Sequence, residues 1–178
     1  MIDIKGAIED SIATKKQVIE FCLSDIQSSA ELMIRAAKEN KSIFWCGNGG
    51  SAADSQHMAA ELMGGLRSHD RRPVKSIALT TDSSFITAWS NDISYDEIFS
   101  RQLDALGEEG DLIVAISTSG NSTNIIETLN LAKKKNINSI ILTGASGGSM
   151  ANMGDCVIKV PSDDLSLIHI SEPTRQSL

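Results

Sequence analysis

The feature that most constrains the fold is the alternation, after residue 40, of short apolar runs with stretches of helical periodicity. The apolar runs cover residues 42–46, 76–79, 112–116, 139–142 and 157–160. The helical stretches between them cover residues 52–63, 85–89, 98–106 and 125–134. Strands that alternate with helices are typical of βαβ units, in which the strands are parallel and the helices cover both faces. The sequence therefore predicts an α/β fold with three layers and a doubly wound parallel sheet.

The stretch before the first of these strands is helical in character from residue 4 to residue 38. Its apolar positions recur at helical spacing, which predicts two helices that extend the domain at its N-terminus. We therefore divide the 178 residues into N-terminal helices at 1–40, one α/β domain at 41–164 and a tail at 165–178. We expect the two helices to pack on the domain.

The composition limits the classes of partner. The chain has 23 acidic and 16 basic residues and a formal net charge of -7. Such a charge argues against nucleic acid and anionic membranes as main partners, and no apolar run approaches the roughly 20 residues that span a bilayer. The cysteines, Cys22, Cys46 and Cys156, lack the paired spacing of a disulfide framework or a zinc knuckle. We therefore expect a soluble, cytoplasmic protein that binds a small anion by local geometry.

The tail breaks the pattern of the domain. Residues 165–178 have a mixed composition without amphipathic period. Residues 165–175 match the in-frame translation of a transposase adapter used in sequencing libraries. We therefore interpret residues 165–178 as a non-native tail and give His169 no role.

A glycine-rich loop follows the first predicted strand. It consists of Gly47, Asn48, Gly49, Gly50 and Ser51. Glycines there bring backbone N–H groups to a helix N-terminus, where partial positive charge favours an anion, although a tight strand-to-helix connection is an equally good interpretation. The loop has neither the Gly-Lys-Ser/Thr of a P-loop nor the spacing of a dinucleotide fingerprint, which argues against nucleotides.

A second polar loop, residues 117–122, follows the third predicted strand. Its hydroxyls belong to Ser117, Thr118, Ser119 and Ser122. One serine could cap the next helix, but four hydroxyls and a glycine at a helix start can surround a phosphate with neutral donors. Parallel strands bring both loops to the same sheet edge, so we expect one shared pocket.

His57 and Glu61 lie one helical turn apart on the predicted helix after the glycine loop. The plain interpretation is a partly buried histidine and a solvated acid. Beside an anion site, the carboxylate could act as general base on an acidic C–H, and both side chains could bind zinc. Two ligands are fewer than the three of a typical catalytic zinc site. Asn91 and Asp92 could end a helix or bind sugar hydroxyls.

Together these segments resemble the bacterial phosphoheptose isomerases, which are sugar isomerase (SIS) domain proteins. The resemblance extends to Asp164 and rests on residues 46–51, 56–57 with Glu61, 78–82, 91–92, 98–102, 116–122 and 142–144. It implies conversion of D-sedoheptulose 7-phosphate to D-glycero-D-manno-heptose 7-phosphate by enediol proton transfer, for heptose and lipopolysaccharide biosynthesis. It also implies a homotetramer, with the helices of residues 1–40 at the oligomer interface and neighbouring subunits completing each pocket.

The resemblance also implies a role for each site residue. The sugar contacts would be Asn48, Gly49, Gly50, Ser51, Glu61, Asn91 and Asp92. The phosphate would be held by Ser117, Thr118, Ser119 and Ser122. His57 and Glu61 match zinc ligands, and Glu61 also matches the base that transfers the proton.

Two departures from the family pattern bear on activity. The family's other zinc ligands, a glutamine and a histidine, come from a C-terminal helix that this sequence lacks after Asp164. We therefore expect one zinc ion per site with ligands missing from this chain, and impaired turnover by a truncated chain. Gly65 stands where related sequences often carry arginine, and Arg67 is a candidate to replace that substrate contact.

Other functions remain open. One is a non-catalytic SIS protein that binds a phosphosugar and regulates a protein partner such as a replication initiator. Such relatives tend to lose the helix glutamate and to change the serine loop, so Glu61 and Ser119 favour the enzyme. Another is a different sugar-phosphate isomerase or a structural SIS module, which would share the phosphate loop but not the pair of His57 and Glu61.

Overall fold

The sheet has five parallel strands in the order β2-β1-β3-β4-β5. The computed structural model describes residues 3–65 and 69–162. The strands are β1 (Ile43–Gly47), β2 (Ser76–Ala78), β3 (Leu112–Ser117), β4 (Asn138–Thr143) and β5 (Cys156–Lys159). The predicted parallel sheet is confirmed, and each predicted strand lies within two residues of its observed position.

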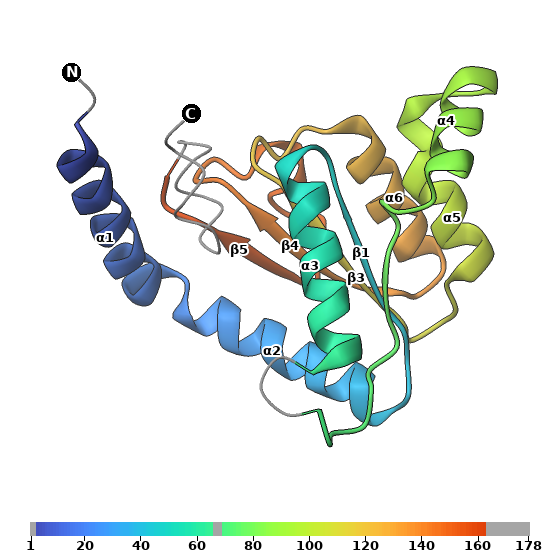
Figure 1. Cartoon of the computed structure of the whole chain (residues 1–178), viewed down its shortest axis with the longest axis horizontal. Coiled ribbons are helices and arrows are strands. Elements are labelled where there is room, and N and C mark those ends of the chain that lie inside the picture. Colours follow the sequence, from blue (N-terminus) through green and yellow to red (C-terminus); the bar gives the residue numbers. More distant parts are fainter. Residues whose placement is uncertain (1–2, 66–68, 163–178) are drawn as a thin grey trace.

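Helices cover both faces of the sheet, which confirms the three-layer α/β prediction (Figure 1). They are α1 (Ile4–Phe21), α2 (Leu23–Lys38), α3 (Gly50–Gly64), α4 (Ser83–Asp92), α5 (Ile98–Leu106) and α6 (Thr123–Lys134), with short 3-10 turns η1 (Tyr95–Glu97) and η2 (Gly148–Met150). Side chains of a strand alternate between faces. Phe44 and Cys46 therefore pack against α5 and α6, whereas Ile43 and Trp45 pack against α2 and α3.

The strand order creates a switch point between β1 and β3. The chain leaves β1 for α3 on one face, and it leaves β3 for α6 on the other face. Gly47 at the end of β1 pairs in register with Ile116 near the end of β3. The loops after these two strands therefore start side by side at the carboxyl edge, where open α/β sheets bind their ligands.

The N-terminal helices differ in how they meet the domain. Helix α2 contacts β5, and the contact includes hydrogen bonds from the Cys22 thiol to the Lys159 carbonyl and from the Cys156 thiol to the Asp25 carbonyl, both at 3.1 Å. Helix α1 stands away from the sheet (Figure 1), and its buried residue is Thr14. Among the helices of the described segments, none is long and apolar enough to cross a membrane.

All three cysteines are buried and free. Cys46 lies on β1 in the core, and burial raises the pKa of its thiol well above the ordinary value because the thiolate would be desolvated there. A thiol that stays protonated is a poor nucleophile and metal ligand. Cys46 therefore acts as a packing group, as its apolar sequence surroundings indicate.

Candidate active site

The glycine loop after β1 has the shape that its glycines allow. A Cβ atom on Gly47 would lie 2.7 Å from the backbone oxygen of Ser51, so only glycine lets α3 start this close to the strand. Gly49 has a φ of 57°, a conformation that side chains disfavour, and it is the N-cap residue of α3. The tight-connection interpretation thus accounts for Gly47 and Gly49. It does not account for Asn48, whose side chain reaches across to another element.

Asn48 joins the two predicted loops. Its amide pairs reciprocally with the amide of Asn124, each nitrogen lying 2.9 Å from the other oxygen. Asn124 is 2% exposed and sits in the first turn of α6, directly after the serine loop. The hydroxyl of Tyr95 also donates to the Asn48 oxygen, at 2.9 Å. The loops after β1 and β3 therefore lie side by side and are joined by direct hydrogen bonds.

The serine loop is held partly by itself. The hydroxyls of Ser117 and Ser122 lie 3.0 Å apart and bond to each other, and Ser117 is buried. Ser122 is the N-cap residue of α6, yet its side chain makes no capping bond to that helix. Ser119 is exposed, and its hydroxyl accepts from the Asn121 N–H at 3.2 Å, which leaves its own proton to donate. The simple capping interpretation of these hydroxyls is therefore not supported.

A third loop, which follows β4, supports the serine loop from behind. The Gly144 N–H donates to the Thr118 carbonyl at 2.9 Å, and Asn121 accepts from both the N–H and the hydroxyl of Ser149 at 2.9 Å. A Cβ atom on Gly120, which has a φ of 64°, would lie 2.0 Å from the Gly147 oxygen. The two backbones therefore touch, and the polar loop has a rigid base.

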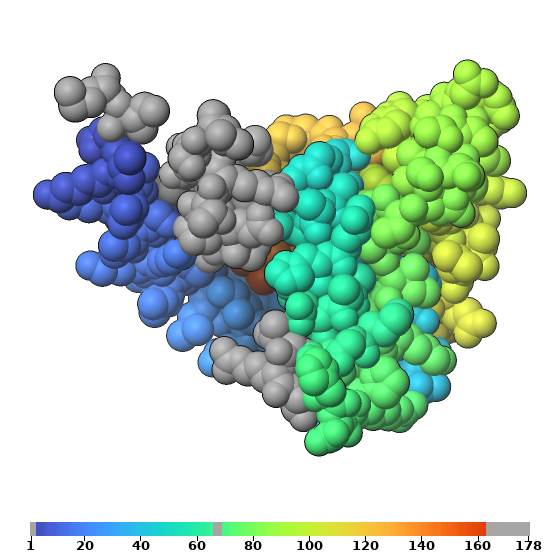
Figure 2. Space-filling view, in the orientation of Figure 1, coloured from blue at the N-terminus to red at the C-terminus, as the bar shows by residue number. Residues whose placement is uncertain are grey.

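His57 and Glu61 project from the outer face of α3. The buried side of this helix carries Ser51, Ser55 and Ala59. The Nε2 atom of His57 lies 3.4 Å from Oε1 of Glu61, and the two side chains are 50% and 31% exposed. At about 1.5 Å of rise per residue, Glu61 lies about 15 Å along the helix from Ser51. Figure 2 shows α3 at the surface of the molecule.

Within residues 3–65 and 69–162, no group of three or more His, Cys, Asp or Glu side chains could hold a metal ion. His57 and Glu61 offer one nitrogen and carboxylate oxygens, which suit zinc, but a catalytic zinc site normally takes three protein ligands. The described residues therefore fit a zinc site only in part.

The end of α3 is fixed by a residue that the sequence did not reveal. Nη2 of Arg71 donates to the carbonyls of Glu61 and Leu62, each at 2.7 Å. A cation on the last carbonyls of a helix is favoured by the helix dipole. Gly65, the C-cap residue, has a φ of 95°, which explains why glycine stands there. Arg67 lies outside the described residues, as do Asp164 and the tail at 165–178.

Asn91 and Asp92 form the last turn of α4, so they do not follow the helix as residues 85–89 alone would predict. The Asn91 amide donates to Asp92 at 2.7 Å, and both residues are exposed. No hydrogen bond joins them to the two loops within the described part of the chain. Their connection to the pocket runs along the chain to Tyr95, whose hydroxyl reaches Asn48. Neither Tyr95 nor Asn124 carries a sequence signal, because both depend on contacts between distant elements.

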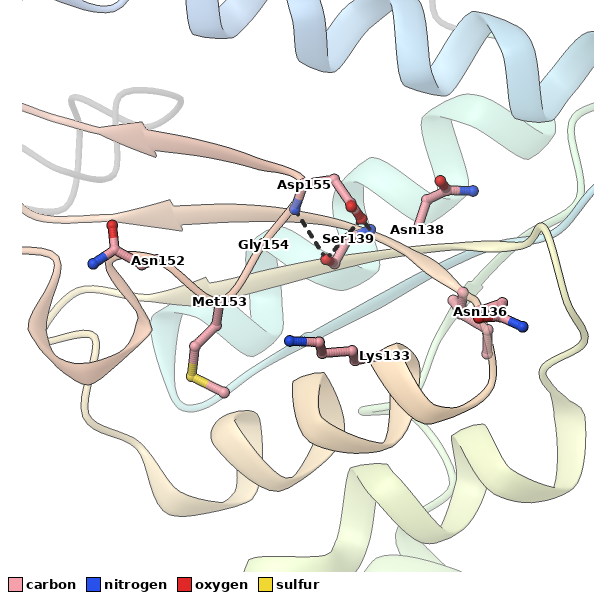
Figure 3. Close-up of a pocket in the computed structure, with 9 residues that line it drawn as sticks. Lys133, Asn136, Asn138, Ser139, Asn152, Met153, Gly154 and Asp155 are labelled. Carbon is pink, nitrogen blue, oxygen red and sulfur yellow. Dashed lines mark hydrogen bonds between the residues drawn. The ribbon is translucent and has the colours of Figure 1, made fainter.

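A different cavity, of about 440 Å³, lies at the opposite edge of the sheet (Figure 3). It is lined by the end of α6, the start of β4 and the segment that enters β5, including Lys133, Ser139 and Asp155. The Asp155 carboxylate accepts from the backbone N–H of Ser139 at 2.7 Å and from its hydroxyl at 3.1 Å. These polar groups join the two strands to each other. The cavity is far from the switch point and does not contribute to the candidate site.

Comparisons with known proteins identify the family of the chain. Residues 8–144 match the family model described as SIS domain. The phosphoheptose isomerase of Shewanella denitrificans is 47% identical over 163 residues, which cover 90% of this chain and 83% of that protein. The chain belongs to the phosphoheptose isomerases of the SIS-domain family. It is accordingly a sugar-phosphate isomerase, and the non-catalytic alternative is not favoured.

Solved structures of phosphoheptose isomerases have the same fold as this chain. GmhA from Neisseria gonorrhoeae superposes with a TM-score of 0.85 at 39% identity, covering 93% of this chain and 88% of that one. A phosphoheptose isomerase from Francisella tularensis superposes with a TM-score of 0.89 at 34% identity, covering 93% and 87%. The fold is therefore that of the family, with the N-terminal helices included in the match.

Proposed function

We propose that this phosphoheptose isomerase converts D-sedoheptulose 7-phosphate to D-glycero-D-manno-heptose 7-phosphate, for heptose and surface polysaccharide biosynthesis. The observation that carries the proposal is the pair of 2.9 Å bonds between Asn48 and Asn124, which join the glycine loop to the start of the serine loop and helix α6. A phosphosugar needs a phosphate cradle and a hydroxyl-binding surface side by side, and this pair brings the two together.

The phosphate is assigned to the serine loop. Ser117, Thr118, Ser119 and Ser122 lead into the N-terminus of α6, whose backbone N–H groups and dipole favour an anion. Ser117 is buried and bonded to Ser122, so it shapes the loop, while Thr118 and Ser119 are more exposed donors. This cradle uses neutral donors, which suits a chain with a net charge of -7.

The sugar is assigned to the glycine loop and the outer face of α3. Asn48, Gly49, Gly50 and Ser51 would contact hydroxyls near the phosphate, with Asn91 and Asp92 as further hydroxyl partners. Glu61, about 15 Å along the helix from Ser51, would meet the far end of an extended chain. A long sugar phosphate, with its reacting carbons remote from the phosphate, suits this separation better than a short one.

Glu61 is assigned as the base. The carboxylate removes a proton from C1 of the ketose while the C2 oxygen takes up a proton, which gives the enediol. The same carboxyl then returns its proton to C2 while the C1 hydroxyl gives up its proton, which gives the aldose, so that the net change also moves one proton from O1 to O2. His57, 3.4 Å from Glu61, can orient the carboxylate. His57 and Glu61 also have the chemistry to contribute two ligands to a zinc ion, which would supply charge stabilisation to the substrate oxygens. The donors beyond these two would come from outside the described residues.

Turnover tests this proposal directly. The chain of 178 residues and a form whose residues from 165 onward are replaced by the C-terminal segment of the Shewanella denitrificans relative are both given sedoheptulose 7-phosphate, and the product is followed by NMR. We expect turnover by the extended form, and at least about tenfold slower turnover by the 178-residue chain because its described residues supply only two metal donors. If the relative is active and neither form is, the substrate assignment is wrong.

The oligomer is assigned to the N-terminal helices. Ile4, Ile8, Ile12 and Ile19 on α1 are all more than 45% exposed, and the first three are spaced four residues apart on one helix face. An apolar stripe of this kind on a lone chain would be an aggregation hazard unless another surface covers it. We infer that α1 forms a subunit interface of a homotetramer, whose subunits complete one another's pockets.

Sedimentation velocity tests the interface. The double substitution Ile8→Glu and Ile12→Glu is expected to convert the tetramer to smaller species at micromolar concentration, because two carboxylates would be buried without partners. Gln17→Glu places one negative charge on the opposite face of α1 and should leave the tetramer intact. If the double variant still forms tetramers, α1 is not part of the subunit interface.

A further inference from the structure

The Asn48 amide is held by two residues outside the assigned site. Its oxygen accepts hydrogen bonds from Tyr95 Oη and from Asn124 Nδ2, both at 2.9 Å. Its nitrogen donates to Asn124 Oδ1, also at 2.9 Å. An amide oxygen has two lone pairs and an amide nitrogen has two protons. Three of the four hydrogen-bonding positions of Asn48 are therefore occupied within the described chain.

The remaining position is one N–H of Asn48, which makes no hydrogen bond to any described residue. Because both lone pairs of the oxygen are filled, Asn48 can offer a ligand a proton but cannot accept one. The Tyr95 hydroxyl is needed for this, because without it one lone pair of the Asn48 oxygen could accept a hydrogen bond from a ligand. We propose that Tyr95 and Asn124 are positioning residues that make Asn48 a pure hydrogen-bond donor toward a hydroxyl or carbonyl oxygen of the sugar.

This inference rests on the proposed role of Asn48 as a sugar contact. The two partners differ in their surroundings. Asn124 is 2% exposed at the start of α6, so its pairing with Asn48 also sets the spacing between the glycine loop and the serine loop. Tyr95 is 51% exposed on η1. Its hydroxyl can therefore be removed without opening a cavity in the core, which makes it the cleaner residue to test.

The test measures binding of two ligands by titration calorimetry to the 178-residue chain. Tyr95→Phe is expected to weaken sedoheptulose 7-phosphate about three- to tenfold, the effect of one hydrogen bond, and to leave inorganic phosphate unchanged. Thr87→Val removes a hydroxyl that bonds carbonyls within the neighbouring helix α4, and it should change neither ligand. Equal weakening of both ligands by Tyr95→Phe would indicate general loosening and overturn the proposal.

A double-mutant cycle separates positioning from independent contact. Asn48→Ala should weaken the sugar phosphate, and adding Tyr95→Phe should then cause no further loss, because Tyr95 acts through Asn48. Asn124→Asp keeps an acceptor for Asn48 but removes the donor to its oxygen, and it should also weaken the sugar phosphate. Its negative charge beside the serine loop is expected to weaken inorganic phosphate as well, so Tyr95→Phe is the selective test. Additive losses from Asn48→Ala and Tyr95→Phe would overturn the proposal. Failure of the unsubstituted chain to bind the sugar phosphate would instead count against the proposed function.

Discussion

Replacing Glu61 by glutamine is expected to reduce kcat for sedoheptulose 7-phosphate about 10²- to 10⁴-fold, the usual contribution of a general base. Glutamine has nearly the same shape but cannot take a proton from carbon. The measurement applies to any form of the chain that turns over this substrate. Because Glu61 lies about 15 Å along α3 from Ser51, affinity for inorganic phosphate at the serine loop should be unchanged.

The matched control is Glu127→Gln, which makes the same chemical change at an exposed position on α6. It should leave kcat within about twofold, since surface substitutions away from a site have small effects. A Glu61→Gln variant with ordinary kcat would remove Glu61 from proton transfer. Loss of phosphate affinity along with kcat would mean that the substitution disturbs α3 as a whole.

The sheet could be predicted from the sequence because each strand is recognisable from its own short segment. Each strand is a short apolar run, and strands β1 and β3 are buried along their full length, so the apolar character of these segments is unbroken. The βαβ alternation then fixes parallel pairing and places both polar loops at the carboxyl edge. Periodicity does not supply the ends of elements, and α4 accordingly runs on to include Asn91 and Asp92.

The contacts that join the site could not be predicted in the same way. Asn48 and Asn124 are 76 residues apart, and their side chains meet only because Gly47 and Ile116 pair in register. Tyr95 reaches Asn48 from a 3-10 turn, and Arg71 reaches the end of α3 from a loop. Such pairings depend on three-dimensional register and on loop paths, neither of which leaves a periodic trace in the sequence.

The glycines of the two loops are required for different structural reasons, which the sequence does not distinguish. Gly47 is required by the close start of α3, and Gly49 by its positive φ. Both requirements belong to the connection between strand and helix. Gly120 belongs to the other loop, where its requirement is the approach of a second backbone. The ligand argument therefore depends on the polar side chains and N–H groups that these glycines expose, and not on the number of glycines.

Gly120→Ala is expected to destabilise the protein by about 3 kcal/mol, the sum of a left-handed backbone penalty and of overpacking. The added Cβ would lie 2.0 Å from the oxygen and 2.5 Å from the carbonyl carbon of Gly147. These are backbone atoms of a loop tied to residues 118 and 121 by hydrogen bonds, so they cannot move aside without disturbing the serine loop. Phosphate affinity should therefore fall together with stability.

Two other glycines separate the causes of this loss in urea unfolding experiments. Gly110 has a φ of 84°, but a Cβ there would meet only the flexible side chain of Lys41. Gly110→Ala should therefore lower the free energy of unfolding by about 1 kcal/mol, from backbone conformation alone. Gly64 lies in α3 with nothing within 4 Å of an added Cβ. Gly64→Ala should therefore raise the free energy of unfolding by about 0.5–1 kcal/mol. If Gly120→Ala lowers the free energy of unfolding no more than Gly110→Ala does, the loop after β4 must move to accommodate the added Cβ. The serine loop would then lack the rigid base on which its assignment as a phosphate cradle depends.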